Sequence, residues 1–173
     1  LRRSRGLGDV YKRQVENIND INDLNLTGND KIAYLTQTTL SIDDTQNIIN
    51  ELRKKFPNIE SSPKEDICYA TSNRQKAIKE YANKCDAFIV VGSKNSSNSN
   101  RLVEVAKKAG CLNSHLLENA ESLNLSNYSS SSIIGISSGA SVPEVLVENV
   151  ISKFQENYSL EIENVSLGEE NVQ

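Results

Sequence analysis

Two spacings of apolar residues alternate along this chain. Short and nearly continuous apolar runs predict strands, which occupy residues Lys31–Leu35, Ala87–Val91 and Ile133–Ile136. Between these runs, apolar residues recur every three or four positions, which predicts helices at Ser41–Phe56, Thr71–Asn83, Asn98–Ala109 and Pro143–Phe154. Because strands and helices alternate in this order, the pattern predicts an α/β fold with a parallel-type sheet flanked by helices.

Individual residues support these elements. Ala87–Val91 (AFIVV) has no polar position, as expected for a parallel strand that is buried on both faces. Ser41 is placed to cap the following helix, with Asp44 three residues later as its capping-box partner. Pro57 ends that helix. Pro143 is predicted at an early helical position, where its missing N–H is not needed.

The two ends of the chain differ in composition from its middle. Residues 1–14 are rich in arginine, and we interpret them as a non-native scar; a basic N-terminal arm is the alternative. The chain contains no Met and starts at Leu1, which favours a sequence that begins within a longer gene. Residues 155–173 are acidic and polar and are predicted to form a frayed tail.

Composition and charge exclude several classes of protein. The net charge of -4 and the pI near 5.1 argue against a nucleic-acid or membrane-surface protein, because such proteins usually present a basic face. No apolar run approaches the roughly 20 residues that a membrane span requires. No signal peptide is visible either, so the cytoplasm is the expected compartment.

Small hydroxyl and amide residues follow three of the predicted strands. They form the segments TQTT (Thr36–Thr39), GSKNSSNSN (Gly92–Asn100) and SSGAS (Ser137–Ser141). In open α/β sheets, ligands bind at the carboxyl ends of strands, where helix N-termini offer free N–H groups to anions. Convergence of the three loops would make a site for a phosphorylated or carboxylated small molecule. The alternative is that each residue only caps a helix or forms a turn.

Spacing alone favours a structural role for the cysteines and gives the histidine no partner. Three cysteines without a C-x-x-C pair do not form a disulfide framework. Cys68 precedes a predicted helix and is therefore also a candidate low-pKa thiolate, but one cysteine cannot hold a metal cluster by itself. Cys85 and Cys111 are predicted to be buried thiols. His115 lies in a further predicted strand with no Cys or acid at ligand spacing, so no catalytic role is expected.

Four stretches taken together resemble one known family. They are TQTTLSIDDT (36–45), EDICYATSNRQ (65–75), VVGSKNSSNSNRL (90–102) and SSGASVPEVLVENV (137–150). In this order and spacing they resemble the 4-hydroxy-3-methylbut-2-enyl diphosphate reductases, also called the LytB family, over residues 15–154. The string GSKNSSNSNRL is specific to that pattern.

The resemblance implies a three-lobed α/β protein built around a 4Fe-4S cluster, with one cysteine ligand from each lobe. Residues 15–63 would be the last part of the middle lobe, and residues 64–154 the C-terminal lobe. The implied reaction belongs to the non-mevalonate (MEP) isoprenoid pathway. Two electrons and two protons remove the hydroxyl of an allylic diphosphate, which gives isopentenyl and dimethylallyl diphosphates. The resemblance implies a flavodoxin or a ferredoxin as electron donor.

The resemblance also implies roles for particular residues. Cys68 becomes a cluster ligand, in place of the structural role that spacing favoured. Thr38 would lie near the reacting end of the substrate, and Thr71 would line the cavity. The residues implied to bind the diphosphate are Ser96, Ser97, Asn98 and Ser141. Cys85 and Cys111 match no ligand position of the family and stay structural.

Several family positions have no counterpart in this chain. They are the other two cluster cysteines, the active-site histidines and the proton-relaying glutamate, which the family places before residue 15. We therefore expect the chain alone to hold no stable cluster and to have no reductase activity. A truncated, non-catalytic module that binds a diphosphate or another small anion is the second hypothesis, and an unrelated sugar-phosphate-binding domain is the third.

Overall fold

The computed structural model describes residues 12–27, 30–37, 39–61 and 69–165, with the side chain of Tyr69 left out. The chain divides into two compact units. Unit 1 comprises Leu1–Leu35 and Asp43–Pro63, and unit 2 comprises Thr36–Ile42 and Lys64–Gln173. Among the residues just given, no helix is long and apolar enough to cross a membrane.

Unit 1 is a small βαβ arrangement with one additional short helix. Its elements are α1 (Ile18–Asn22), β1 (Ala33–Tyr34), α2 (Ile42–Lys55, whose first residue is grouped with unit 2) and β2 (Glu60–Ser61). β1 and β2 pair in parallel, and α2 is the crossover between them. The core of this unit consists of Ile21, Leu24, Leu52 and Phe56.

Two features of unit 1 differ from the sequence prediction. The strand predicted over Lys31–Leu35 contains only Ala33–Tyr34, because only those two residues pair with β2 and Leu35 is 79% exposed. Helix α1 was not predicted, since five residues rich in Asn and Asp carry no helical apolar period. A capping box starts this helix, with Asn17 as the N-cap and Asp20 as its partner.

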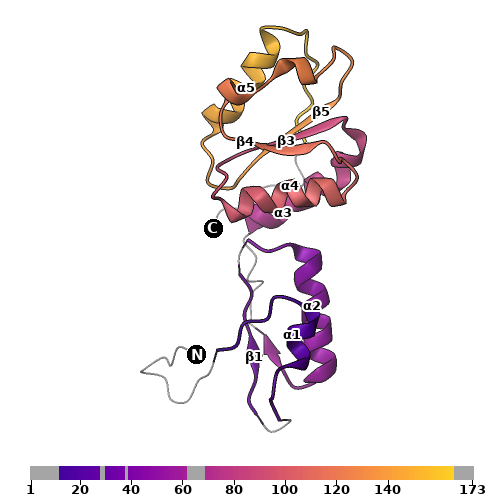
Figure 1. The fold of residues 1–173 in the computed structure, drawn as a ribbon, viewed down its shortest axis with the longest axis vertical. Coiled ribbons are helices and arrows are strands. Elements are labelled where there is room, and N and C mark those ends of the chain that lie inside the picture. Colours follow the sequence, from indigo (N-terminus) through magenta and orange to yellow (C-terminus); the bar gives the residue numbers. More distant parts are fainter. Residues whose placement is uncertain (1–11, 28–29, 38, 62–68, 166–173) are drawn as a thin grey trace. The chain divides into compact units, whose positions relative to one another are not determined.

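Unit 2 contains a three-stranded parallel sheet in the order β4-β3-β5. Its elements are α3 (Tyr69–Tyr81), η1 (Ala82–Lys84), β3 (Ala87–Val91), α4 (Ser97–Lys108), β4 (Ser114–Leu117), η2 (Ala120–Ser122), η3 (Leu125–Asn127), β5 (Ile134–Ser138) and α5 (Glu144–Gln155). Helices α3 and α4 cover one face of the sheet, and α5 covers the other (Figure 1). The predicted α/β class with a parallel sheet between helices is confirmed.

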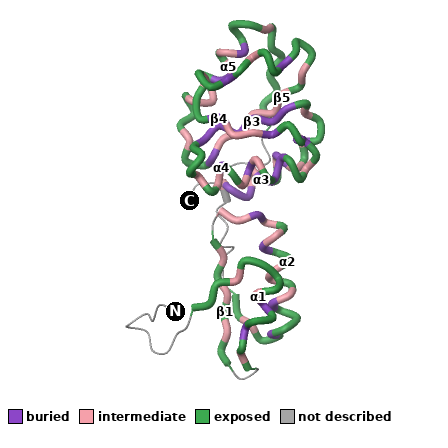
Figure 2. Tube along the Cα trace, in the orientation of Figure 1, coloured by how far each residue is buried: buried purple, intermediate pink, exposed green. Residues whose placement is uncertain are grey.

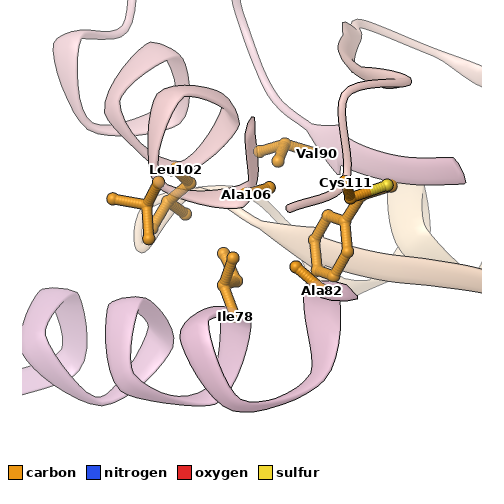
Figure 3. Packing of buried hydrophobic residues seen from close by; sticks show 8 residues of the cluster. Ile78, Ala82, Val90, Leu102, Ala106 and Cys111 are labelled. Atoms are coloured by element: carbon orange, nitrogen blue, oxygen red, sulfur yellow. The ribbon is translucent and has the colours of Figure 1, made fainter. Parts of the chain in front are cut away.

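The middle strand β3 joins the two layers of the core. All five of its residues are buried, as predicted for a strand with both faces covered. Phe88 and Val90 pack with α3 and α4, whereas Ala87, Ile89 and Val91 pack on the α5 side. Figure 3 shows the first layer, in which Ile78 of α3 points toward Leu102 and Ala106 of α4. Buried residues gather accordingly in and around this sheet (Figure 2).

Two expectations for unit 2 need correction. Pro143 is not a helical residue; it is the N-cap of α5 with extended backbone (φ -60, ψ 136). The tail predicted after Phe154 is not frayed at Tyr158, whose hydroxyl donates to the carbonyl oxygens of Leu125 and Tyr128, each at 3.2 Å. The composition of the tail is polar, but this one aromatic ring anchors its first residues to the α5 side of the core.

Candidate functional site

The candidate site lies where β3 and β5 end side by side. The two strands are parallel neighbours, and Val91 is in register with Ser138. The amide of Gly139 then donates to the carbonyl oxygen of Val91 at 3.1 Å. The loops that follow the two strands therefore leave the same edge of the sheet, which is where ligands bind in parallel α/β folds.

The loop after β3 leads into the first turn of α4. Ser96 is the N-cap of this 12-residue helix, and its hydroxyl oxygen accepts a hydrogen bond from the amide of Ser99 at 3.2 Å. Within the described part of the chain, the amides of Ser97 and Asn98 have no hydrogen-bond partner. Free N–H groups and the partial positive charge of a helix N-terminus suit an anion at this position.

Asn98 carries an unsatisfied group at this turn. Its Oδ1 atom is buried and has no hydrogen-bond partner among the residues that the structure describes. A buried acceptor without a partner costs about 1–3 kcal/mol, so such an oxygen is usually satisfied by a hydrogen-bond donor such as a water. Ser97 in the same turn is exposed.

The loop after β5 packs against this turn at Gly139. A Cβ atom added to Gly139 would lie 2.4 Å from the Oγ atom of Ser99 and 3.7 Å from the Nδ2 atom of Asn98. This close approach confirms that two of the three predicted loops converge. Ser141 follows two residues later and is exposed.

The third loop, residues 36–42, follows a strand of the other sheet but is grouped with unit 2. Its Thr38 lies outside the described residues. The side chain of Gln75 on α3 holds the end of this loop: it donates to the carbonyl oxygen of Leu40 at 2.9 Å and accepts from the amide of Ile42 at 3.2 Å. Thr71, one turn earlier on α3, is only 2% exposed.

A metal cluster does not fit the described residues alone. Cys68 lies outside them, and no group of three or more His, Cys, Asp or Glu side chains comes together in the ranges given above. Cys85 and Cys111 are free thiols. Burial, and then the proximity of Cys111, raises the pKa of the Cys85 thiol, which disfavours the thiolate that iron would need. Cys111 is buried as predicted, whereas Cys85 is only half-buried and lines the edge of β5.

His115 lies in β4, as predicted, and bonds to Tyr128. Its Nε2 atom is 3.1 Å from the hydroxyl oxygen of Tyr128. Burial, and to a smaller extent the charge of Lys107, lowers the pKa of His115, so the imidazole is neutral at pH 7. The histidine is in register with Ile89 in the middle of the sheet, which agrees with a structural role.

Residues that sequence reasoning did not single out support the loop after β3. The carboxylate of Glu118 accepts a hydrogen bond from the amide of Lys94 at 3.2 Å and forms an ion pair with its ammonium group at 3.3 Å. Ser99 is completely buried beneath Ser96. The sequence did carry a signal for Ser99, because it stands three residues after an N-cap serine; nothing local marked Glu118.

A groove of about 1170 Å³ runs along β5 and is lined by residues of both α3 and α5. Its lining includes Arg74 and Tyr81 of α3 and the serines of residues 129–132. Of the three predicted loops, only SSGAS reaches it, through Ser137 and Ser138 at the end of β5. The groove therefore adjoins the strand-end site at Ser138, whereas Ser96, Ser97, Asn98 and Ser141 do not line it.

The fold and the strand-end loops define an α/β protein with a candidate anion site at the first turn of α4. Residues 6–155 match the model of the LytB protein family. The chain belongs to that family. The match begins within residues 1–14, so it gives no support to a boundary at residue 14.

Similar proteins agree with this assignment. The chain is 48% identical over 158 residues to the 4-hydroxy-3-methylbut-2-enyl diphosphate reductase of Beijerinckia indica, which covers 91% of the chain and 50% of that protein. Identity to the enzyme of that name from Actinobacillus succinogenes is also 48% over 158 residues, covering 91% of the chain and 50% of that protein. The chain spans about half the length of these curated relatives.

A solved structure matches the fold as well as the sequence. The E-1-hydroxy-2-methyl-but-2-enyl-4-diphosphate reductase of Plasmodium falciparum matches with a TM-score of 0.76 and 37% identity. The match covers 90% of this chain and 51% of that one. The family assignment therefore holds at both levels.

Proposed function

We propose that this chain works as the diphosphate-holding part of a 4-hydroxy-3-methylbut-2-enyl diphosphate reductase. The observation that carries the proposal is the convergence of the loops after β3 and β5 on the first turn of α4. The free amides of Ser97 and Asn98 and the hydroxyls of Ser96 and Ser141 supply donors for diphosphate oxygens. The names of the relatives, which match over 91% of the chain, support this substrate class.

The proposed reaction removes the allylic hydroxyl with two electrons and two protons. Water leaves, and isopentenyl and dimethylallyl diphosphates are the products. A 4Fe-4S cluster would supply the redox chemistry, with Cys68 as the ligand from this chain and the other ligands from outside it. This chain would contribute Thr38 near the reacting end of the substrate and Thr71 as a cavity residue. Both assignments rest on the family motifs.

The proposed partners and compartment follow from the same reaction. A flavodoxin or a ferredoxin would deliver the electrons one at a time. The cytoplasm is the proposed compartment, and the free thiols of Cys85 and Cys111 agree with a reducing environment.

A second function remains tied to a specific observation. Because the described residues do not assemble a cluster site, a module that binds diphosphate without redox chemistry would have the same strand-end loops. The two proposals differ in their dependence on Cys68, since a pure anion binder does not need that thiol.

A chimera tests the proposal. The part of the Actinobacillus succinogenes reductase that this chain matches, 50% of that protein, is replaced by this chain. We expect the reconstituted chimera to reduce the allylic diphosphate with a reduced viologen dye. Cys68→Ser should abolish both the cluster absorbance and the activity. The matched control Cys85→Ser should retain both, because that thiol interacts with the backbone of Tyr81 and Gly135 and matches no ligand position of the family.

The isolated chain provides the complementary test. After anaerobic reconstitution with iron and sulfide, we expect no stable 4Fe-4S absorbance on the monomer and no reduction of the substrate. A chimera that binds pyrophosphate but never reduces the allylic diphosphate would favour the binding module instead.

A further inference from the structure

We infer that Ser99 is a positioning residue that fixes the hydroxyl of Ser96 as a hydrogen-bond donor toward the ligand. This inference rests on the proposed function, because Ser96 has a ligand only if the first turn of α4 binds diphosphate. It extends that function to a residue that makes no contact with the ligand itself.

The Ser99 side chain is enclosed by two glycines, and a larger residue at either glycine position would collide with it. The side chain is 0% exposed. A Cβ atom added to Gly92, at the end of β3, would lie 2.3 Å from its Oγ atom, and one added to Gly139, after β5, would lie 2.4 Å from it. Both distances are far below van der Waals contact. The two strand ends therefore keep the Ser99 hydroxyl in one place.

The Ser99 hydroxyl donates to the Ser96 hydroxyl oxygen at 3.1 Å. The amide of Ser99 donates to the same oxygen at 3.2 Å. A serine hydroxyl has two acceptor lone pairs and one proton. Both lone pairs of Ser96 are thus occupied from within the protein, and its proton is the only hydrogen-bonding capacity that remains.

This arrangement selects the chemistry of the ligand. A hydroxyl that can only donate suits a group that can only accept, and the oxygens of an ionised diphosphate are such acceptors. Without the Ser99 hydroxyl, Ser96 regains a free lone pair and can turn its proton elsewhere. Fixing the orientation of the Ser96 hydroxyl would then cost entropy when the ligand binds, which weakens the affinity.

Ser99→Ala separates this role from helix capping. The capping bond from the Ser99 amide to Ser96 remains in that variant, so α4 keeps its N-cap. Only the second bond is lost. One neutral hydrogen bond corresponds to a factor of roughly five in affinity, so we expect pyrophosphate to bind about fivefold more weakly to the variant.

The experiment is a pyrophosphate titration of the full chain, with two-dimensional amide NMR spectra recorded at each concentration. It is run on four proteins: the unaltered chain, Ser96→Ala, Ser99→Ala and the double variant. If Ser99 acts through Ser96, the double variant binds no more weakly than Ser96→Ala alone. Ser114→Ala is the matched control, since Ser114 is also buried and hydrogen-bonded, to the carbonyl oxygen of Cys111, but lies in β4. Its affinity should equal that of the unaltered chain.

The outcomes distinguish a failure of the role given to Ser99 from a failure of the anion site itself. The role of Ser99 is overturned if the affinity losses of the two single variants multiply in the double variant, or if Ser99→Ala binds pyrophosphate with unchanged affinity. Either result leaves the site itself intact. Failure of the unaltered chain to bind pyrophosphate at any concentration overturns the site and the inference together. The amide spectrum of each variant shows whether it is folded, so a lost affinity is not mistaken for unfolding.

Discussion

Replacing Gln75 by alanine should release the end of loop 36–42 from helix α3. Gln75 is 0% exposed, and both ends of its amide are used by backbone groups that lie 33 and 35 residues earlier in the chain. It accepts from the amide of Ile42 and donates to the carbonyl oxygen of Leu40. A single side chain therefore satisfies two backbone groups of a loop that carries family motif residues.

The magnitude follows from those two bonds. Each contributes about 1 kcal/mol net, and a buried group that loses its partner costs about 1–3 kcal/mol. Leu40 and Ile42 are half-buried, so water can replace part of what Gln75 provides. The removed side-chain atoms also leave a cavity. We expect Gln75→Ala to lower the free energy of unfolding by about 2–3 kcal/mol.

Urea unfolding measures this change, and amide hydrogen exchange at Ile42 locates it. The exchange of that amide should accelerate by at least the factor that the lost bond implies, roughly fivefold. Gln46→Ala is the matched control, since Gln46 is exposed and its side chain donates to the side chain of Asn50 within the same helix. It should change stability by less than about 0.5 kcal/mol. An unchanged urea midpoint together with unchanged exchange at Ile42 would refute the role given to Gln75.

Two further predictions concern the sheet and the loop after β3. Gly135→Ala places a Cβ atom 2.3 Å from the ring of Phe88, which is 4% exposed; the overpacking should cost about 1–3 kcal/mol, measured by thermal unfolding. The Lys94 amide lowers the pKa of Glu118 below its ordinary value of 4.5. The folded state therefore gains stability above pH 4.5 and loses it as the pH falls through the lowered value, and in Glu118→Gln this part of the pH dependence should disappear.

The sequence predicted best the elements that are specified by their local pattern of apolar and polar residues. β3 was predicted to the residue, because five apolar positions in succession fit only a strand with both faces covered. Helices α2, α4 and α5 agree within one residue at each end, because their apolar periods and end signals coincide. β1 was predicted too long, since the length of a strand depends on its partner, and β2 offers only two residues.

The candidate site divides in the same way. The sequence motif GSKNSSNSNRL was sufficient to single out Ser96, Ser97 and Asn98. In the structure, Ser96 is the N-cap of α4. The residues that hold these in place could not be found locally. Glu118 reaches Lys94 from 24 residues away, and Gln75 reaches Ile42 from 33. Such support depends on tertiary contacts, which no local pattern records.

Anion binding and reduction should therefore separate in this chain. The strand-end site needs only β3, β5 and the first turn of α4, all of which belong to unit 2. The proposed reduction would need a cluster, and the described residues provide no ligand set for one. We expect the chain alone to bind pyrophosphate in the NMR titration while showing no reductase activity, and the chimera to regain reduction without a change in the residues that shift on pyrophosphate binding. Different shifted residues in the chimera would mean that the strand-end site is not where the substrate's diphosphate is held.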